Sequence, residues 1–234
     1  MIKNLLDSKK VFIFDLDGTL IDSLGVWDKI DTLFVRKYYD GDVPPTYSYY
    51  QKNILPKLNG EDPYIEYLKY LIARFDIKDS LEDIIEVRKS IIDETLINDV
   101  SLKPYVKEYF NMIRGNKRIV LATTSTARCL DIYKYDNKST SELDFDNTFE
   151  LMLSGNDVKL HKPDPEIYLK VIEELNINKE DAIVFEDSLV GIEAACRAGL
   201  DVLHVYTPEC ENDLVKIRKL TPYFIENFGE ITKN

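Results

Sequence analysis

The chain places two carboxylates directly after a short apolar run near its start. Residues 11–14, with the sequence VFIF, are followed at once by Asp15, Leu16, Asp17 and Gly18. An unbroken run of β-branched and aromatic residues is typical of a parallel strand covered on both faces, and ligands of open α/β sheets bind just beyond the carboxyl ends of such strands. Two acids there repel each other unless a cation or a proton neutralises part of their charge. The run therefore predicts either a divalent cation site or an acidic turn that merely ends the strand.

Three later segments place further polar groups at predicted strand or loop ends. The apolar run 120–122 ends in hydroxyls, a lysine precedes the helix start favoured by Pro165, and the predicted strand 182–185 ends in two acids. Each segment alone has an ordinary explanation: turn-forming threonines, a solvated lysine, or acids at the positive end of a helix. Together they predict a magnesium-assisted phosphoryl-transfer site, built from Thr123, Thr124 and Ser125, then Lys162, then Glu186 and Asp187.

The four segments resemble the four motifs of the haloacid-dehalogenase (HAD) superfamily of aspartate-nucleophile hydrolases. The matching stretches are DLDGTLIDS, LATTS, HKPDP and FEDSLVGIEAA, and the likeness runs from Val11 to about Val205. The resemblance implies an α/β fold, with a doubly wound, Rossmann-like parallel sheet and an inserted all-helical cap domain. It also implies the site roles. Asp15 is the nucleophile and Asp17 the general acid/base; Thr123, Thr124 and Lys162 bind phosphate; and Mg²⁺ is held by Asp15, Asp17 through its backbone carbonyl, Glu186 and Asp187.

Physical chemistry supports these roles independently. A carboxylate such as Asp15 can accept a phosphoryl group and so divide one difficult step into two. Because nucleophile and phosphate are both anionic, a cation is needed between them, and Lys162 adds a second positive charge. Asp17 can protonate the leaving oxygen and then deprotonate the attacking water, which requires that it start protonated.

The segment between the first two motifs differs from the rest of the chain, because its apolar residues have helical spacing. Apolar residues recur at helical spacing around 27–34, 64–71 and 81–92, whereas 41–60 is rich in proline, tyrosine and asparagine and is predicted to be a loop or broken helix. We expect residues 1–22 and 103–234 to form the core domain and residues 23–102 to form a cap that excludes water and opens to release product. Arg74 and Arg88 are candidate cap cations, with solvation as the ordinary alternative.

Charge and composition limit the classes of partner. A net charge of −12 and a pI near 4.7 argue against binding to nucleic acid or an anionic membrane. The three cysteines lack metal or disulfide spacing, and neither a signal peptide nor an apolar span of membrane length is evident. We therefore expect a cytoplasmic protein whose partner is a small phosphorylated metabolite, with no obligate protein partner evident.

The favoured function is that of a magnesium-dependent phosphatase acting on a small phosphorylated metabolite, with a sugar phosphate preferred. The alternative is a sugar-phosphate mutase similar to β-phosphoglucomutase, which returns the phosphoryl group to its substrate. Thr19 and Trp27 favour the phosphatase, because the mutase branch usually has valine and histidine at these positions. A dehalogenase is less expected, since that branch lacks the equivalent of Asp17.

Overall fold

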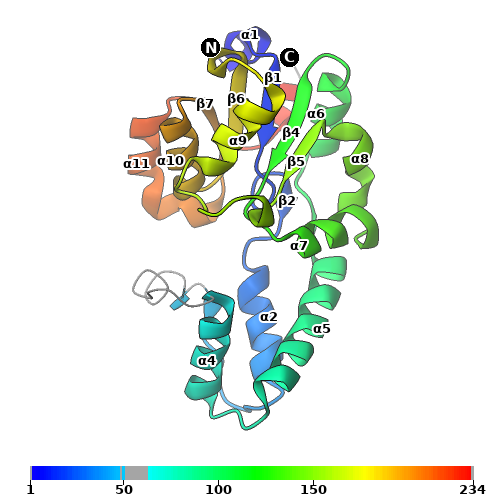
Figure 1. Ribbon diagram of the computed structural model, residues 1–234, viewed down its shortest axis with the longest axis vertical. Helices are drawn as coiled ribbons and strands as arrows, with labels where there is room; N and C mark the ends of the chain where they lie inside the picture. The colour runs from blue at the N-terminus through cyan, green and yellow to red at the C-terminus, as the bar shows by residue number, and fades with distance from the viewer. Residues whose placement is uncertain (1, 48, 51–62, 233–234) are drawn as a thin grey trace. The chain divides into compact units, whose positions relative to one another are not determined.

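The computed structural model describes residues 2–47, 49–50 and 63–232, and its backbone divides into two compact units (Figure 1). One unit comprises residues 1–23 and 100–234, and the other comprises residues 24–99. Within the described residues, no helix is both long enough and apolar enough to cross a membrane.

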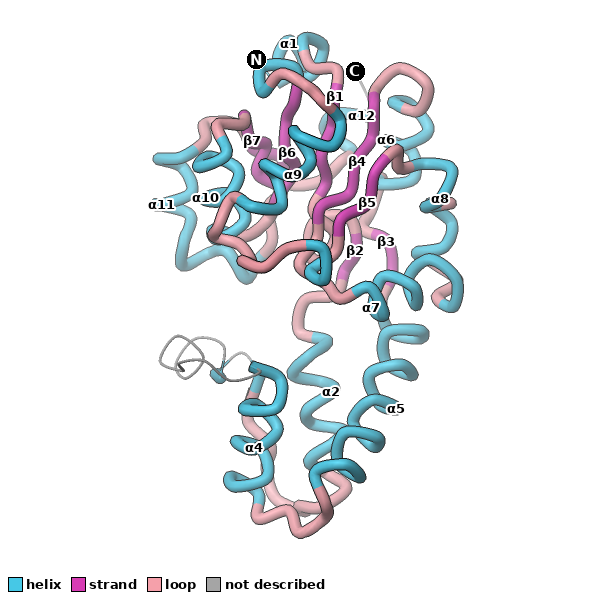
Figure 2. The backbone as a smooth tube through the Cα atoms, viewed as in Figure 1, coloured by secondary structure: helices cyan, strands magenta, loops and turns pink. Residues whose placement is uncertain are grey.

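The first unit is built on a six-stranded sheet with the order β5-β4-β1-β6-β7-β8, in which every neighbouring pair is parallel (Figure 2). From β1 the chain first adds strands on one side and later adds strands on the other, so the direction of winding reverses at β1. The predicted doubly wound α/β fold is therefore confirmed. The strands are β1 (Val11–Phe14), β4 (Arg118–Ala122), β5 (Leu151–Leu153), β6 (Ala182–Glu186), β7 (Asp201–Val205) and β8 (Phe224–Ile225).

Helices cover both faces of this sheet, which explains why β1 is apolar throughout and why β6 is apolar up to its last residue, Glu186. All four residues of β1 and all five of β6 are buried. On one face, Ile13 and Val184 belong to a core cluster shared with α9, α10 and α11; on the other, Phe14 stacks on Phe185 and packs against Phe110 of α6. The helices of this unit are α1 (Ile2–Ser8), α6 (Val106–Ile113), α7 (Ala127–Asp131), α8 (Phe145–Thr148), α9 (Glu166–Leu175), α10 (Leu189–Ala198), α11 (Leu214–Leu220) and α12 (Gly229–Thr232).

A small second sheet closes the base of the long insertion. Strand β2 (Ile21–Asp22) pairs antiparallel with β3 (Ser101–Leu102), with Ile21 opposite Leu102. Both strands belong to the first unit. The pairing therefore fixes the departing and returning segments of the chain beside each other.

The second unit is helical, as its apolar periodicity predicts. It contains α2 (Val26–Val35), α4 (Pro63–Phe75) and α5 (Leu81–Asp99). Much of the predicted 41–60 loop lies outside the described residues. Of the two candidate cap cations, Arg88 is not solvated: its side chain is 1% exposed and donates to Asp31 at 2.9 Å. Thr46 donates to the other oxygen of Asp31 at 2.9 Å.

Candidate active site

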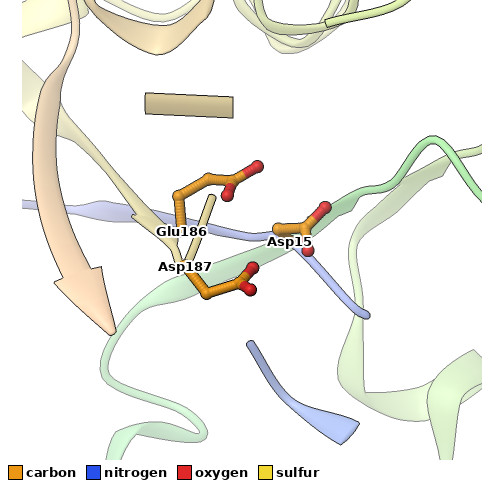
Figure 3. Close-up of side chains that lie close together, drawn as sticks. All are labelled: Asp15, Glu186 and Asp187. Carbon is orange, nitrogen blue, oxygen red and sulfur yellow. The ribbon is translucent and has the colours of Figure 1, made fainter. Parts of the chain in front are cut away.

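The carboxyl ends of two adjacent strands bring the predicted acids together. Asp15 follows β1, and Glu186 and Asp187 lie at the end of β6, the immediate neighbour of β1. One carboxylate oxygen from each of the three residues lies within 4.8 Å of the other two (Figure 3). All three residues are buried. The register Phe14 with Phe185 explains the meeting, because it places the first residue after β1 beside the last residue of β6.

Lys162 reaches this cluster from the loop that precedes α9. Its Nζ donates to Asp15 Oδ1 at 2.6 Å, to Glu186 Oε1 at 2.7 Å and to the carbonyl oxygen of Ala122 at 3.1 Å. Burial alone would lower the pKa of Lys162, but Asp15 and Glu186 raise it well above its usual range. The lysine is thus a fixed positive charge in direct contact with the predicted nucleophile.

The three carboxylates carry more negative charge than Lys162 neutralises. Burial, together with Glu186 and Asp187, raises the pKa of Asp15 well above its usual range despite the opposing effect of Lys162. Burial and Glu186 likewise raise the pKa of Asp187. A set of buried carboxylate oxygens with uncompensated charge fits a hard divalent cation, and Asp15, Glu186 and Asp187 are the residues that could hold one.

Two glycines give the acids room. Gly18 has a φ of 79°, and a Cβ there would lie 2.3 Å from Asp187 Oδ2. In the first turn of α10, a Cβ on Gly191 would lie 1.7 Å from Glu186 Oε1. Thr19 Oγ1 donates to Asp187 Oδ1 at 3.1 Å, so the turn that contains Gly18 also holds Asp187.

Asp17 points its carboxylate at hydroxyl groups. It accepts hydrogen bonds from Ser23 Oγ at 2.7 Å and from Ser125 Oγ at 2.5 Å. Among the described residues, the close carboxylate cluster comprises Asp15, Glu186 and Asp187, without the side chain of Asp17. Asp17 is therefore near the site but bound by a different set of partners.

The predicted phosphate-binding threonines occupy different environments after β4. Thr123 is buried; its backbone N–H donates to Leu153 at 3.0 Å, and its Oγ1 accepts from the Ser125 N–H at 3.0 Å. Thr123 comes directly after β4, the strand next to β1, and its hydroxyl can still donate its own hydrogen. Thr124 follows the same strand but is exposed.

Sequence reasoning missed several residues near the site, among them Tyr133, whose hydroxyl donates to Asp17 Oδ1 at 3.5 Å. Lys103 Nζ donates to the carbonyl oxygen of Gly18 at 2.6 Å, and the hydroxyl of Tyr168 donates to Glu186 Oε1 at 3.4 Å. Tyr168 lies six residues after Lys162, on the first turn of α9, and the Lys162 Nζ is 5.1 Å from the centre of its ring. The Lys162 motif could have indicated Tyr168, but no local signal marks Lys103.

Comparison with known proteins identifies the family of the chain. The family model for haloacid dehalogenase-like hydrolases matches residues 12–205. A phosphorylated carbohydrates phosphatase of Thermotoga maritima is 35% identical over 198 residues, covering 82% of each chain. Hexitol phosphatase B of Escherichia coli is 27% identical over 206 residues, covering 86% of this chain and 85% of that protein.

Solved structures share the fold. A candidate β-phosphoglucomutase from Thermotoga maritima has a TM-score of 0.74 and 27% identity, covering 92% of this chain and 94% of its own. CbbY from Rhodobacter sphaeroides, in complex with phosphate, has a TM-score of 0.68 at 21% identity, covering 95% and 96%; this second likeness concerns the fold alone. The predicted family and the predicted enzyme class are confirmed: the chain is an enzyme that belongs to the haloacid dehalogenase-like hydrolases.

Proposed function

We propose that this protein is a magnesium-dependent phosphatase that hydrolyses a phosphorylated carbohydrate through an aspartyl-phosphate on Asp15. The observation that carries the proposal is the contact between the buried ammonium of Lys162 and Asp15, beside two further acids. This arrangement fixes one carboxylate at a strand end and lowers the repulsion that an incoming phosphate would meet. The relatives named as a phosphorylated carbohydrates phosphatase and a hexitol phosphatase support the substrate class.

The chain's own residues account for the two chemical steps. One oxygen of Asp15 attacks the phosphorus, forming the acyl-phosphate bond while the ester bond breaks. Lys162 and the Thr123 hydroxyl stabilise the charge on the transferring oxygens. Asp17 gives a proton to the leaving oxygen and takes one back from the water that hydrolyses the intermediate. Asp15, Glu186 and Asp187, together with the Asp17 carbonyl, would hold Mg²⁺, which would supply further positive charge to the phosphate.

Ser23 and Ser125 give Asp17 its orientation in this scheme. The two hydroxyls donate to different oxygens of its carboxylate, and each oxygen keeps a lone pair that a proton can occupy. A hydroxyl can reverse its role and accept from a protonated acid. The serines therefore allow Asp17 to serve in both protonation states without leaving its place.

We further propose that the helical unit of residues 24–99 is the cap, and that it carries substrate selectivity. The assignment of residues 23–102 to a cap domain, and of 1–22 and 103–234 to a core domain, belongs to this proposal. So does the expectation of a cytoplasmic protein without nucleic acid, membrane or obligate protein partners.

The mutase alternative is favoured by one observation, the structural likeness to a candidate β-phosphoglucomutase. Thr19 argues for the phosphatase, because its hydroxyl donates to Asp187, a hydrogen bond that the valine usual in the mutase branch cannot make. Phosphorus NMR of glucose 1-phosphate and several hexose 6-phosphates separates the two. A phosphatase releases inorganic phosphate in step with substrate loss, whereas an isomeric sugar phosphate that forms faster than inorganic phosphate would favour the mutase.

The decisive experiment measures phosphate release from a panel of sugar, polyol and nucleotide phosphates. Chelation should abolish activity, Mg²⁺ should restore it, and Ca²⁺ should fail because its looser coordination misplaces the nucleophile. Asp15→Asn should also abolish turnover while keeping the fold, because an amide is a far poorer nucleophile. Residual activity above about a tenth of wild type in protein free of deamidation would refute the nucleophile, given the usual size of nucleophile effects.

A further inference from the structure

Lys103 connects the returning end of the insertion to the turn that follows the nucleophile. It comes directly after β3, and its backbone N–H donates to the carbonyl oxygen of Leu20 at 2.9 Å. Its side-chain Nζ donates to the carbonyl oxygen of Gly18 at 2.6 Å and lies 3.5 Å from that of Tyr206. All of these residues belong to the first unit. One lysine thus contacts two segments that are distant in sequence, one of them inside the first motif.

The carbonyl that Lys103 binds belongs to a crowded turn. Gly18 lies so close to Asp187 that a Cβ would be 2.3 Å from its Oδ2, and the next residue, Thr19, donates to Oδ1 of the same acid. The backbone N–H groups of Thr19 and Leu20 return to the Leu16 carbonyl at 3.2 and 2.8 Å. The turn therefore has its own hydrogen bonds, and Lys103 supplies a donor to its outward carbonyl.

The ammonium group of Lys103 is partly buried. Burial lowers its pKa, while Asp187, Asp22 and Glu209 oppose that effect. An ammonium carries three N–H donors and no acceptor, so a partly buried lysine needs oxygen partners, and the turn provides one at 2.6 Å. This geometry differs from that of Lys107, whose exposed side chain pairs with Glu142 on the surface.

We propose that Lys103 is a positioning residue for the reaction. Its hydrogen bond to the Gly18 carbonyl keeps the turn between Asp15 and Thr19 in one conformation. That conformation orients the carboxylates of Asp15 and Asp17 and preserves the hydrogen bond from Thr19 to Asp187. The proposal rests on the proposed phosphatase function for its kinetic consequence, but its structural consequence can be measured without any substrate.

The test compares Lys103→Met, Lys103→Arg and the matched control Lys107→Met. Methionine keeps the aliphatic length and removes the donor, whereas arginine retains donors that can reach a carbonyl. Hydrogen exchange, read by mass spectrometry on the peptide that spans residues 16–22, reports the turn directly. We expect exchange in this peptide to be at least roughly tenfold faster in Lys103→Met and close to wild type in Lys103→Arg and Lys107→Met.

The kinetic arm uses phosphate release at a temperature well below the melting midpoint of every variant. Lys103→Met should lower kcat by roughly 10- to 100-fold, since small displacements of reacting groups have effects of that size. Its KM should stay within about threefold of wild type, because the interaction orients catalytic groups and does not bind substrate. Arginine should restore most of the kcat.

Two results would overturn the proposal. Unchanged exchange in Lys103→Met would show that the lysine does not hold the turn, and a kcat equal to that of Lys107→Met would show that holding it has no catalytic effect. A wild-type enzyme without phosphatase activity on the whole panel would refute the proposed function instead. Faster exchange in Lys103→Met would still support the positioning role in that case.

Discussion

A methyl group added at Gly191 should displace the Glu186 carboxylate. The alanine Cβ would lie 1.7 Å from Oε1, 2.0 Å from Cδ and 2.5 Å from Oε2 of Glu186. Ordinary contacts between such atoms are about 3.5 Å, so the carboxylate has to move by roughly 1.5 Å or more. Because Gly191 lies on the first turn of α10 and Glu186 ends a central strand, the side chain of Glu186 is the part that can move.

The cost follows from the hydrogen bonds that Glu186 would lose. It accepts from Lys162 Nζ at 2.7 Å and from the Ser188 N–H at 3.0 Å. Hydrogen bonds to charged groups contribute about 1.5–3 kcal/mol each, and alanine favours a helix over glycine by about 1 kcal/mol. We therefore expect Gly191→Ala to lower the free energy of unfolding by about 2–5 kcal/mol.

Activity should fall further than stability alone would require. Lys162 would lose one of its two carboxylate partners and could follow Glu186 away from Asp15, and a displacement of about 1 Å costs roughly 100-fold in rate. Urea unfolding and phosphate release measure the two effects. Val190→Ala is the matched control, because the neighbouring valine is 47% exposed on the same helix turn. A Gly191→Ala variant with the stability and activity of this control would refute the steric reasoning.

Three further changes act on stability, each checked by urea unfolding. Arg88→Met should cost about 3–5 kcal/mol, because it leaves the fully buried Asp31 without its ion-pair partner; a cost below 1 kcal/mol would contradict this. Tyr105→Gly should be stabilising by about 1 kcal/mol, since Tyr105 has a φ of 66° that glycine adopts without strain; a loss of stability would mean that its ring packing outweighs the strain. Burial, and secondarily Arg218, lowers the pKa of His204 to about 4 from 6.5, so the unfolded chain binds the proton first and stability should fall as pH drops from 6.5 toward 4. His204→Asn should remove that dependence.

The strand-end acids could be predicted because their signal is local. An apolar run followed by acids identifies both a buried strand and its polar end, and the parallel order of such strands places their ends together. What the pattern could not give is the partner of each acid. Lys162 is 147 residues from Asp15, and only the folded sheet shows that it contacts the predicted nucleophile directly.

The partners of Lys103 and Arg88 were beyond prediction for a related reason. Lys103 binds a backbone carbonyl. Because every residue has such a carbonyl, the amino-acid type of the partner gives no sign of this contact. Arg88 shares the buried face of α5 with Ile84 and Ile91, and its pairing with Asp31 spans 57 residues. A charged residue is buried only when its partner is buried with it, and such pairs are visible only after the helices have packed.

The balance of charge at the strand ends explains why lysine alone does not complete the site. When all are ionised, the carboxylates of Asp15, Glu186 and Asp187 face the ammonium groups of Lys162 and Lys103, which leaves an excess of negative charge. A phosphate monoester brings about 1.5 to 2 further negative charges at neutral pH. It would therefore be repelled until a divalent cation reverses the sign of the cluster. The acids that favour cation binding thus make substrate binding depend on the cation, so the cation should bind before the phosphate.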